Sequence, residues 1–180
     1  NLIAISVTYT PQHNIIIQLI KDIKKKIKDI PIVLGGNHAK YNYDKFIKAG
    51  VDYVVLGEGE VTMHNLCLYL QGKMKYSEIK GVIGKNKNKK ADTPMFIQDI
   101  DSLPFPAREL FPLKNYYSEK SGPGPMNSKF ASICTSRGCP FVCSYCASSI
   151  YWGRKWRPRS VENVVDEIQM CVEKLDVGQI

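Results

Sequence analysis

Short apolar runs alternate with longer stretches of helical periodicity along the first part of the chain. Residues 2–7, 30–34 and 51–56 are mostly apolar and partly β-branched, as in parallel strands that are covered on both faces. Residues 11–27 and 43–49 instead carry apolar side chains every three or four positions, which predicts amphipathic helices. The repeated order of strand and helix predicts an α/β fold with a doubly wound parallel sheet.

The sequence also indicates how the first helix begins and which residues share a face of the third. Thr10 is predicted to cap the first helix, because a proline follows it at the first helical position. Leu66, Cys67 and Leu70 share one face of a third helix that ends at Gly72. Cys67 is therefore expected to be a core thiol.

The composition changes after Gly72. Residues 82–84 and 95–97 are short apolar runs that we expect to pair as a β-hairpin across a lysine-rich turn. Proline and glycine are frequent in the stretch before residue 129, which is typical of linkers and loops. The predicted organisation is an α/β domain at residues 1–72, a linker with the hairpin at residues 73–128, and a second domain at residues 129–180.

The second domain is predicted to open with a strand at residues 130–134, followed by a loop and a helix. Ser160 can cap this helix, which is expected to run to about residue 175. Cys134 in the strand and Cys171 in the helix are interpreted as structural residues. The helix has one apolar face that we expect to be buried, formed by Val161, Val164, Val165, Ile168, Val172 and Leu175.

Ligands of doubly wound sheets bind beyond the carboxyl ends of the strands, so the three loops there are candidate binding sites. Glycines let a backbone approach a ligand closely, and hydroxyl or N–H groups can donate hydrogen bonds. Gly35 and Gly36 are equally compatible with an ordinary tight turn, and His38 with an ordinary loop histidine. The candidates are Ser6 and Thr8 after the first strand, Gly35, Gly36 and His38 after the second, and Gly57, Glu58 and Gly59 after the third.

Cys139, Cys143 and Cys146 form a C-x3-C-x2-C pattern behind an apolar run. Three thiolates in one short loop can hold three irons of a [4Fe–4S] cluster, which leaves the fourth iron open to another ligand. A zinc site normally takes four ligands, and the second pair is missing here. A zinc site and unliganded thiols nevertheless remain as alternatives, whereas a disulfide framework is typical of small secreted chains.

The net charge of +8 arises partly from two lysine clusters, at residues 24–26 and 85–90. Solvated faces explain these clusters about as well as a nucleic-acid partner does, and the prediction is for no nucleic-acid partner. No apolar run approaches the roughly 20 residues of a membrane-spanning helix, and no signal peptide opens the sequence. We therefore expect a cytoplasmic protein without a membrane partner.

Two sets of motifs resemble a known family. Residues 135–146 resemble the cluster-binding motif of radical S-adenosylmethionine (radical SAM) enzymes. Residues 35–39 and 57–60 resemble the cobalamin-binding module that precedes the barrel in the B12-dependent branch of that family. The resemblance implies a partial doubly wound, Rossmann-like parallel sheet of the cobalamin-binding type in residues 1–72, followed by the first βα unit of a radical SAM (β/α) barrel in residues 129–180.

By this resemblance the cofactors are a [4Fe–4S] cluster, S-adenosylmethionine and cobalamin. Cys139, Cys143 and Cys146 would bind three irons, and the amino and carboxylate groups of S-adenosylmethionine would chelate the fourth. Phe141 and Tyr145 would cover the cluster, with Tyr145 bordering the adenine. The eight candidates in the carboxyl-end loops would contact cobalamin. The implied activity is that of a methyltransferase that generates a 5′-deoxyadenosyl radical, with a small-molecule or peptide substrate and an external flavodoxin- or ferredoxin-like electron donor.

The sequence departs from the family at one motif. Cobalamin modules often contain Asp-x-His-x-x-Gly, and none of His13, His38 and His64 is preceded two residues earlier by Asp. None of them inherits the role of lower cobalt ligand. The sequence starts inside a predicted strand, so we expect a piece of a longer protein that is not a competent enzyme by itself. The alternatives are a radical SAM enzyme whose first domain binds no cobalamin, and a module stabilised by zinc or an iron–sulfur cluster that contacts nucleic acid through the basic residues 154–159.

Overall fold

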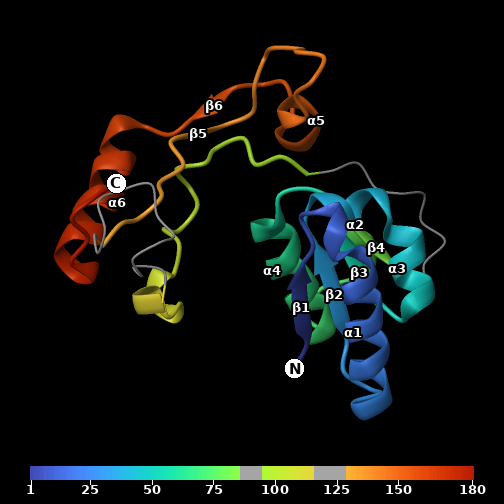
Figure 1. Cartoon of the computed structure of the whole chain (residues 1–180). Helices are drawn as coiled ribbons and strands as arrows, with labels where there is room; N and C mark the ends of the chain where they lie inside the picture. Colours follow the sequence, from blue (N-terminus) through green and yellow to red (C-terminus); the bar gives the residue numbers. More distant parts are fainter. Residues whose placement is uncertain (86–94, 116–128) are drawn as a thin grey trace. The chain divides into compact units, whose positions relative to one another are not determined.

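The computed structural model of the chain describes residues 1–85, 95–115 and 129–180 (Figure 1). These residues form two compact units. The first comprises Asn1–Ile97 with Ile150–Trp152, and the second comprises Gln98–Ser149 with Gly153–Ile180. The first unit thus extends past residue 72, where the sequence predicted a boundary.

A four-stranded sheet forms the centre of the first unit. Its order is β1 (Ile3–Ser6), β2 (Ile32–Gly35), β3 (Tyr53–Val55) and β4 (Val82–Gly84). The first three strands are parallel, and β4 is antiparallel to β3. The predicted α/β fold with a parallel sheet is confirmed, with one antiparallel edge strand added.

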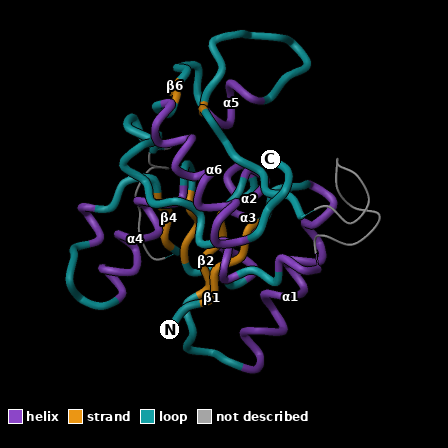
Figure 2. Tube along the Cα trace, turned by 90° about the vertical axis from the view of Figure 1, so that its left-hand side faces the viewer, coloured by secondary structure: helices purple, strands orange, loops and turns teal. Residues whose placement is uncertain are grey.

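Helices cover both faces of this sheet (Figures 1 and 2). On one face lie α1 (His13–Lys26) and α3 (Tyr43–Ala49), and on the other lies α4 (Gly59–Leu70). The larger core packs α1 and α3 against alternate strand residues, and its fully buried members include Ile20, Leu34, Phe46 and Val54. A smaller core beneath α4 contains Val33, Val55, Leu66, Tyr76, Ile79 and Val82.

The predicted hairpin is wrong, because β4 pairs with β3 and the described part of residues 95–97 forms no strand. Val82 and Ile83 gain more burial in the sheet than a two-stranded hairpin would provide. Residues 95–97 instead bind Glu58, whose N–H donates to the Met95 carbonyl over 3.1 Å. The lysine-rich turn at residues 86–90 lies outside the described residues.

Two short helical elements precede the expected helices. A 3-10 turn, η1 (Thr10–Gln12), begins after Tyr9, so Thr10 is its first residue rather than the cap of α1. The Gln12 Oε1 accepts hydrogen bonds from the N–H groups of Thr8 and Tyr9, just before η1. Among the described residues, no side chain caps the start of α1. The helix α2 (Asn37–Tyr41) follows the glycine pair and was not predicted.

The second unit contains a two-stranded ladder and the helix α6. β5 (Ser136–Arg137) pairs antiparallel with β6 (Arg157–Pro158), α5 (Ser148–Trp152) lies in the loop between them, and α6 (Val161–Leu175) follows. The Ser160 Oγ accepts a hydrogen bond from the Asn163 N–H over 3.2 Å, so the predicted cap of α6 is confirmed. The remaining short elements are the 3-10 turns η2 (Tyr76–Glu78), η3 (Arg108–Leu110) and η4 (Leu113–Asn115).

The predicted strand at residues 130–134 is reduced to a single parallel bridge between Phe130 and Gln179. The Ala131 N–H donates to the Gln179 carbonyl over 3.0 Å. The order of strand-like segment, helix and strand-like segment matches the predicted βα unit.

The buried side of α6 differs from the prediction. Val161, Val165 and Val172 are exposed, although their spacing suggested a core face. The side of α6 that is buried contains Glu167 and Cys171. The predicted packing role of Cys171 is confirmed, since it is fully buried with Ala131 and Val177. A charged residue replaces the valines in the core because two arginines neutralise it, and the spacing of apolar residues does not reveal such pairing.

Candidate functional site

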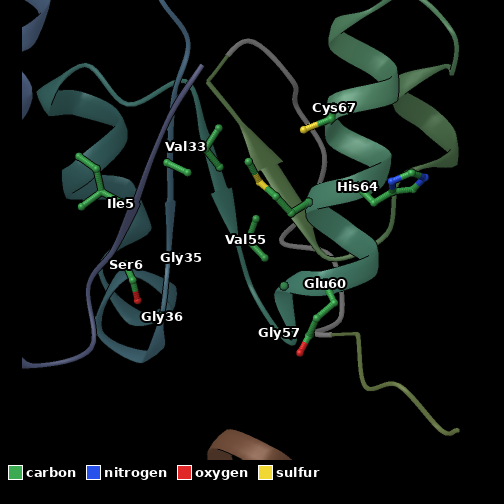
Figure 3. A pocket seen from close by; sticks show the side chains of 13 residues that line it. Ile5, Ser6, Val33, Gly35, Gly36, Val55, Gly57, Glu60, His64 and Cys67 are labelled. Atoms are coloured by element: carbon green, nitrogen blue, oxygen red, sulfur yellow. The ribbon is translucent and has the colours of Figure 1, made fainter. Parts of the chain in front are cut away.

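A cavity of about 760 Å³ lies between the first three strands and α4 (Figure 3). It reaches the carboxyl ends of the strands, where ligands of such sheets bind. Five of the eight loop candidates line it: Ser6, Gly35, Gly36, Gly57 and Gly59. The remaining lining residues are Ala4, Ile5, Val33, Val55, Glu60, Met63, His64 and Cys67.

Small residues on the strands create this space. Ala4 and Ser6 of β1 are exposed, and Gly35 at the end of β2 has no side chain. The core beneath α4 fills the region near β3 and β4 with Val55 and larger residues, and does not include these β1 positions. The sheet surface near β1 is therefore left open to a ligand.

Gly36 shapes the rim of the cavity. Its φ of 90° lies in the left-handed region, and a Cβ there would be 2.7 Å from the carbonyl oxygen of Val7. The same carbonyl accepts the His38 N–H over 3.0 Å. The close approach of the two carboxyl-end loops thus depends on a glycine at position 36. This contact explains the glycine better than an ordinary tight turn does.

The polar groups of the cavity come mainly from α4. Figure 3 shows the sulfur of Cys67 directed from α4 towards the strands, whereas the His64 ring points away from them. Cys67 is half-buried and lines the cavity, so the prediction of a core thiol is wrong. Its helical spacing placed it correctly on the inner side of α4, but the small residues opposite it leave a cavity there.

Thr8, His38 and Glu58 do not line the cavity. The Thr8 N–H donates to Gln12, as described above. Glu58 is buried, and its Oε2 accepts the Ile97 N–H over 2.6 Å. The role that the structure gives Glu58 is to fasten the segment that follows β4.

His38 belongs to a pair of imidazoles on the other side of the sheet. Its Nε2 lies 2.8 Å from Nδ1 of His13, its Nδ1 lies 3.3 Å from the Thr10 hydroxyl, and both rings contact Phe46. Burial lowers the pKa of His38, and the charges of His13 and Lys45 lower it further. We therefore expect His38 to be largely neutral at pH 7.

The three cysteines of the C-x3-C-x2-C pattern lie in the loop between β5 and α5. The ladder of β5 and β6 closes the base of this loop, and the Cys139 N–H donates to the Gly153 carbonyl over 3.1 Å. Gly138 has a φ of 86°, and a Cβ there would be 2.0 Å from the Lys155 carbonyl oxygen. A glycine directly before the first cysteine is therefore required for the two loop ends to meet.

The thiols are accessible. Cys143 and Cys146 are exposed, Cys139 is half-buried, and none of the three forms a disulfide. Three accessible thiols in one loop are the donor set that an iron–sulfur cluster takes. Within the residues that the structure describes, no three such side chains already converge on a metal position.

Two aromatic residues of this loop are also accessible. Phe141 and Tyr145 are 70% and 91% exposed, so in this structure they do not yet shield the thiols. Arg159, which follows β6, donates to the Cys134 carbonyl before the loop and to Glu167 of α6. In the sequence Arg159 is one of the basic residues 154–159, but its pairing with Glu167 was missed because nothing in their spacing indicates it.

Comparison with known proteins agrees with this arrangement. Residues 1–67 match the B12 binding domain family. The chain is 32% identical over 166 residues to an uncharacterized methyltransferase of Pyrococcus horikoshii, covering 88% of this chain and 34% of that protein. It is 33% identical over 172 residues to an anaerobic magnesium-protoporphyrin IX monomethyl ester cyclase of Rubrivivax gelatinosus, covering 90% of this chain and 29% of the cyclase.

A solved structure has the same fold. It is the radical S-adenosylmethionine methyltransferase TsrM from Kitasatospora setae with cobalamin and a [4Fe–4S] cluster bound, which superposes with a TM-score of 0.67 at 21% identity and covers 99% of this chain and 36% of TsrM. The chain thus spans about a third of the length of these proteins.

These matches define the class of the first unit as an α/β domain of the cobalamin-binding, Rossmann-like type. The chain that carries it is similar in sequence to a methyltransferase and a cyclase, and similar in fold to a radical SAM methyltransferase that was solved with cobalamin bound. In the described ranges 1–85, 95–115 and 129–180, none of the helices is long and apolar enough to cross a membrane.

Proposed function

We propose that the chain is part of a cobalamin-dependent radical SAM enzyme with methyltransferase activity. The observation that carries this proposal is the order of two sites along one chain. A domain of the B12-binding family with an open cavity at its carboxyl-end loops comes first, and a loop with three accessible thiols follows it. Neither feature alone would specify this class, because cobalamin domains and three-cysteine loops also occur separately.

The cavity would take the cobalamin. Ala4, Ser6 and Gly35 leave room for a flat or bulky apolar group against the sheet, and Gly57 and Gly59 line the cavity without side chains that would narrow it. Cys67 would contact the ligand from α4. Most of the residues that would contact cobalamin are thus small, and their contribution is to leave room for it.

The cysteine loop would hold the cluster on Cys139, Cys143 and Cys146, with S-adenosylmethionine at the fourth iron. When bound, the reduced cluster supplies the electron that cleaves a carbon–sulfur bond of S-adenosylmethionine, which gives methionine and a 5′-deoxyadenosyl radical. Phe141 and Tyr145 are placed beside the thiols in the sequence, and they would exclude water on loading. Electrons would come from an external flavodoxin- or ferredoxin-like donor, and the substrate would be a small molecule or a peptide.

Methyl transfer is supported by the names of the relatives, several of which are methyltransferases. Cyclases with similar sequences also occur, so the substrate has to be established by experiment.

The first experiment measures both cofactors on one sample. The protein is reconstituted anaerobically with iron and sulfide, incubated with hydroxocobalamin and desalted. We expect about four irons and four acid-labile sulfides per chain, and a retained visible spectrum of cobalamin. About one zinc without sulfide would favour the zinc module. A loaded cluster without retained chromophore would instead favour a radical SAM protein that does not bind cobalamin.

A further inference from the structure

Glu167 is the centre of a buried charge cluster in the second unit. Its side chain is 1% exposed and lies on the inner side of α6. The Arg108 Nη2 donates to Glu167 Oε1 over 2.6 Å, and the Arg159 Nη1 donates to Glu167 Oε2. Both arginine side chains are themselves largely buried, so these interactions are poorly screened by water.

Arg159 connects this cluster to the base of the cysteine loop. Its Nη1 donates to the carbonyl of Cys134 over 3.1 Å, and its backbone N–H donates to the carbonyl of Thr135 over 2.9 Å. Thr135 directly precedes β5, and Arg159 directly follows β6. The same residue therefore holds the two chain segments that enter and leave the loop of residues 138–156.

Other groups fix the guanidinium of Arg159 in one orientation. Its Nε donates to Asn163 Oδ1 over 2.6 Å, its Nη2 donates to the Asn163 carbonyl over 3.0 Å, and its Cζ lies 5.7 Å from the centre of the Phe105 ring. All three nitrogens of the guanidinium thus have acceptors. A lysine has one nitrogen and cannot make these contacts together.

Arg108 brings a third segment into the cluster. Its Nη2 also donates to the Ser132 carbonyl over 2.8 Å, two residues before the carbonyl that Arg159 holds. Asp101, a few residues earlier, accepts the N–H of Ser160 at the start of α6 through both oxygens, over 3.0 and 3.1 Å. The segment of residues 101–108 is therefore fastened to the residues that lead into the cysteine loop.

The charge balance makes Glu167 the critical member. Two guanidiniums share one carboxylate, and the buried Arg108 Nη1 has no hydrogen-bond partner among the residues that the structure describes. If the carboxylate were neutral, two like charges would remain close together in a poorly hydrated place. Their repulsion would draw the arginines away from the carbonyls of Ser132 and Cys134.

We propose that Glu167 is a positioning residue for the cysteine loop. By holding Arg108 and Arg159 against the backbone before β5, it fixes the base from which Cys139, Cys143 and Cys146 reach the cluster. This inference rests on the proposed function, because it assumes that the loop holds a [4Fe–4S] cluster. Loss of the Glu167 carboxylate should therefore alter the cluster and weaken the binding of S-adenosylmethionine, in addition to any effect on folding.

The experiment compares Glu167→Gln with Glu173→Gln. Glu173 lies on the exposed side of the same helix, where it accepts a hydrogen bond from Gln169. Iron and sulfide content, the EPR spectrum of the reduced cluster, and the concentration of S-adenosylmethionine that half-saturates the spectral change are measured for each. We expect Glu173→Gln to match the wild-type protein, and Glu167→Gln to need about tenfold more S-adenosylmethionine, with a broadened spectrum.

Two further variants separate positioning from folding. Arg159→Lys keeps the charge opposite Glu167, so it should still fold, with a lowered melting temperature because the contacts to Asn163 are lost. It should also shift the spectrum in the same direction as Glu167→Gln. Glu167→Asp keeps the carboxylate and should recover part of the affinity for S-adenosylmethionine. Wild-type spectra and affinity in folded Glu167→Gln and Arg159→Lys would overturn the inference. A wild-type protein that takes up no iron and sulfide would instead overturn the proposed function.

Discussion

The carbonyl oxygen of Val7 lies where it would be only 2.7 Å from a Cβ at position 36, so Gly36 is fitted directly against the end of the first strand. The loops after β1 and β2 meet at this contact, and both contribute to the cavity. The geometry of the cavity therefore depends on the absence of a Cβ at position 36.

The variant Gly36→Ala should displace these loops. An alanine would combine a positive φ with the steric overlap, and we expect a loss of about 1–3 kcal/mol in the free energy of unfolding. Retention of cobalamin after desalting should fall with it. Urea unfolding and visible absorption measure the two effects.

Gly59→Ala is the matched control for that substitution. Gly59 also lines the cavity but is the first residue of α4, and a Cβ there would meet no atom within 4 Å. Its stability should equal or exceed that of the wild type. Equal stabilities of Gly36→Ala and the wild type would contradict the steric argument.

Asp52 should make the fold sensitive to acid. Burial raises the pKa of this carboxyl, but hydrogen bonds from Lys24, Lys85 and the Ile32 N–H outweigh burial and lower the pKa below its ordinary value. A carboxyl with a lowered folded pKa stabilises the protein above its unfolded pKa of about 3.9, and this stabilisation is lost as the pH falls through the folded value.

The variant Asp52→Asn should lower the free energy of unfolding by about 2 kcal/mol at pH 7, since two lysines lose their anionic acceptor. It should also make the stability vary less between pH 5 and pH 2. Asp22→Asn, on the exposed surface of α1, is the control and should melt close to the wild type. Chemical denaturation at several pH values measures the free energy of unfolding of each variant. If Asp52→Asn lost as much stability between pH 5 and pH 2 as the wild type does, the prediction would be refuted.

An NMR titration should reveal the effect of the His13–His38 pair as a lowered pKa of His38. His38 is held neutral by burial and by its charged neighbours, so its pKa should lie below the ordinary value of about 6.5. A histidine with a lowered folded pKa costs stability as the pH falls through the unfolded value, because the unfolded chain then binds the proton more readily. Stability should therefore decline from pH 7 towards pH 5.

His38→Gln should reduce that decline, since the side chain no longer titrates. The substitution His64→Gln, at an exposed position on α4, provides the comparison. A titration of His38 at or above pH 6.5 would show that the pair does not keep this imidazole neutral.

Cobalamin should protect Cys67 from alkylation. Cys67 lines the cavity and is half-buried, so a bound ligand would separate it from a reagent such as iodoacetamide. Peptide mass spectrometry should show labelling at least about tenfold slower in the presence of saturating cobalamin, as for a site that opens only when the ligand leaves. Cys134 is exposed and lies in the second unit, so its labelling is the internal reference. Equal rates at Cys67 with and without bound cobalamin would place the ligand elsewhere.

The apolar runs were sufficient to predict the three parallel strands and α3, because the spacing of their apolar residues is that of a buried strand or an amphipathic helix. They could not show that Val82 and Ile83 pair with β3, since a three-residue run carries little register information. Which side of α6 is buried also depends on residues that are distant in the sequence. Glu167 can be buried because Arg108, 59 residues earlier in the sequence, and Arg159 both pair with its carboxylate.

The candidate site shows the same division. Ser6, Gly35, Gly36, Gly57 and Gly59 were predicted from their position after strands, and the structure brings them to one cavity. Cys67 and Ala4 were missed as lining residues because the cavity exists only where small side chains on the strands face α4, and the sequence does not show which residues face each other. Thr8, His38 and Glu58 follow strands as well, but the Thr8 N–H and the side chains of His38 and Glu58 bind other parts of the fold.

The most direct test of the central claim is the EPR spectrum of the reduced, anaerobically reconstituted protein, recorded with and without S-adenosylmethionine. A cluster held by Cys139, Cys143 and Cys146 has one iron without a protein ligand. The spectrum should therefore contain a [4Fe–4S] signal that shifts when S-adenosylmethionine is added, and Cys143→Ala should lose it. A signal that S-adenosylmethionine leaves unchanged would contradict the assignment.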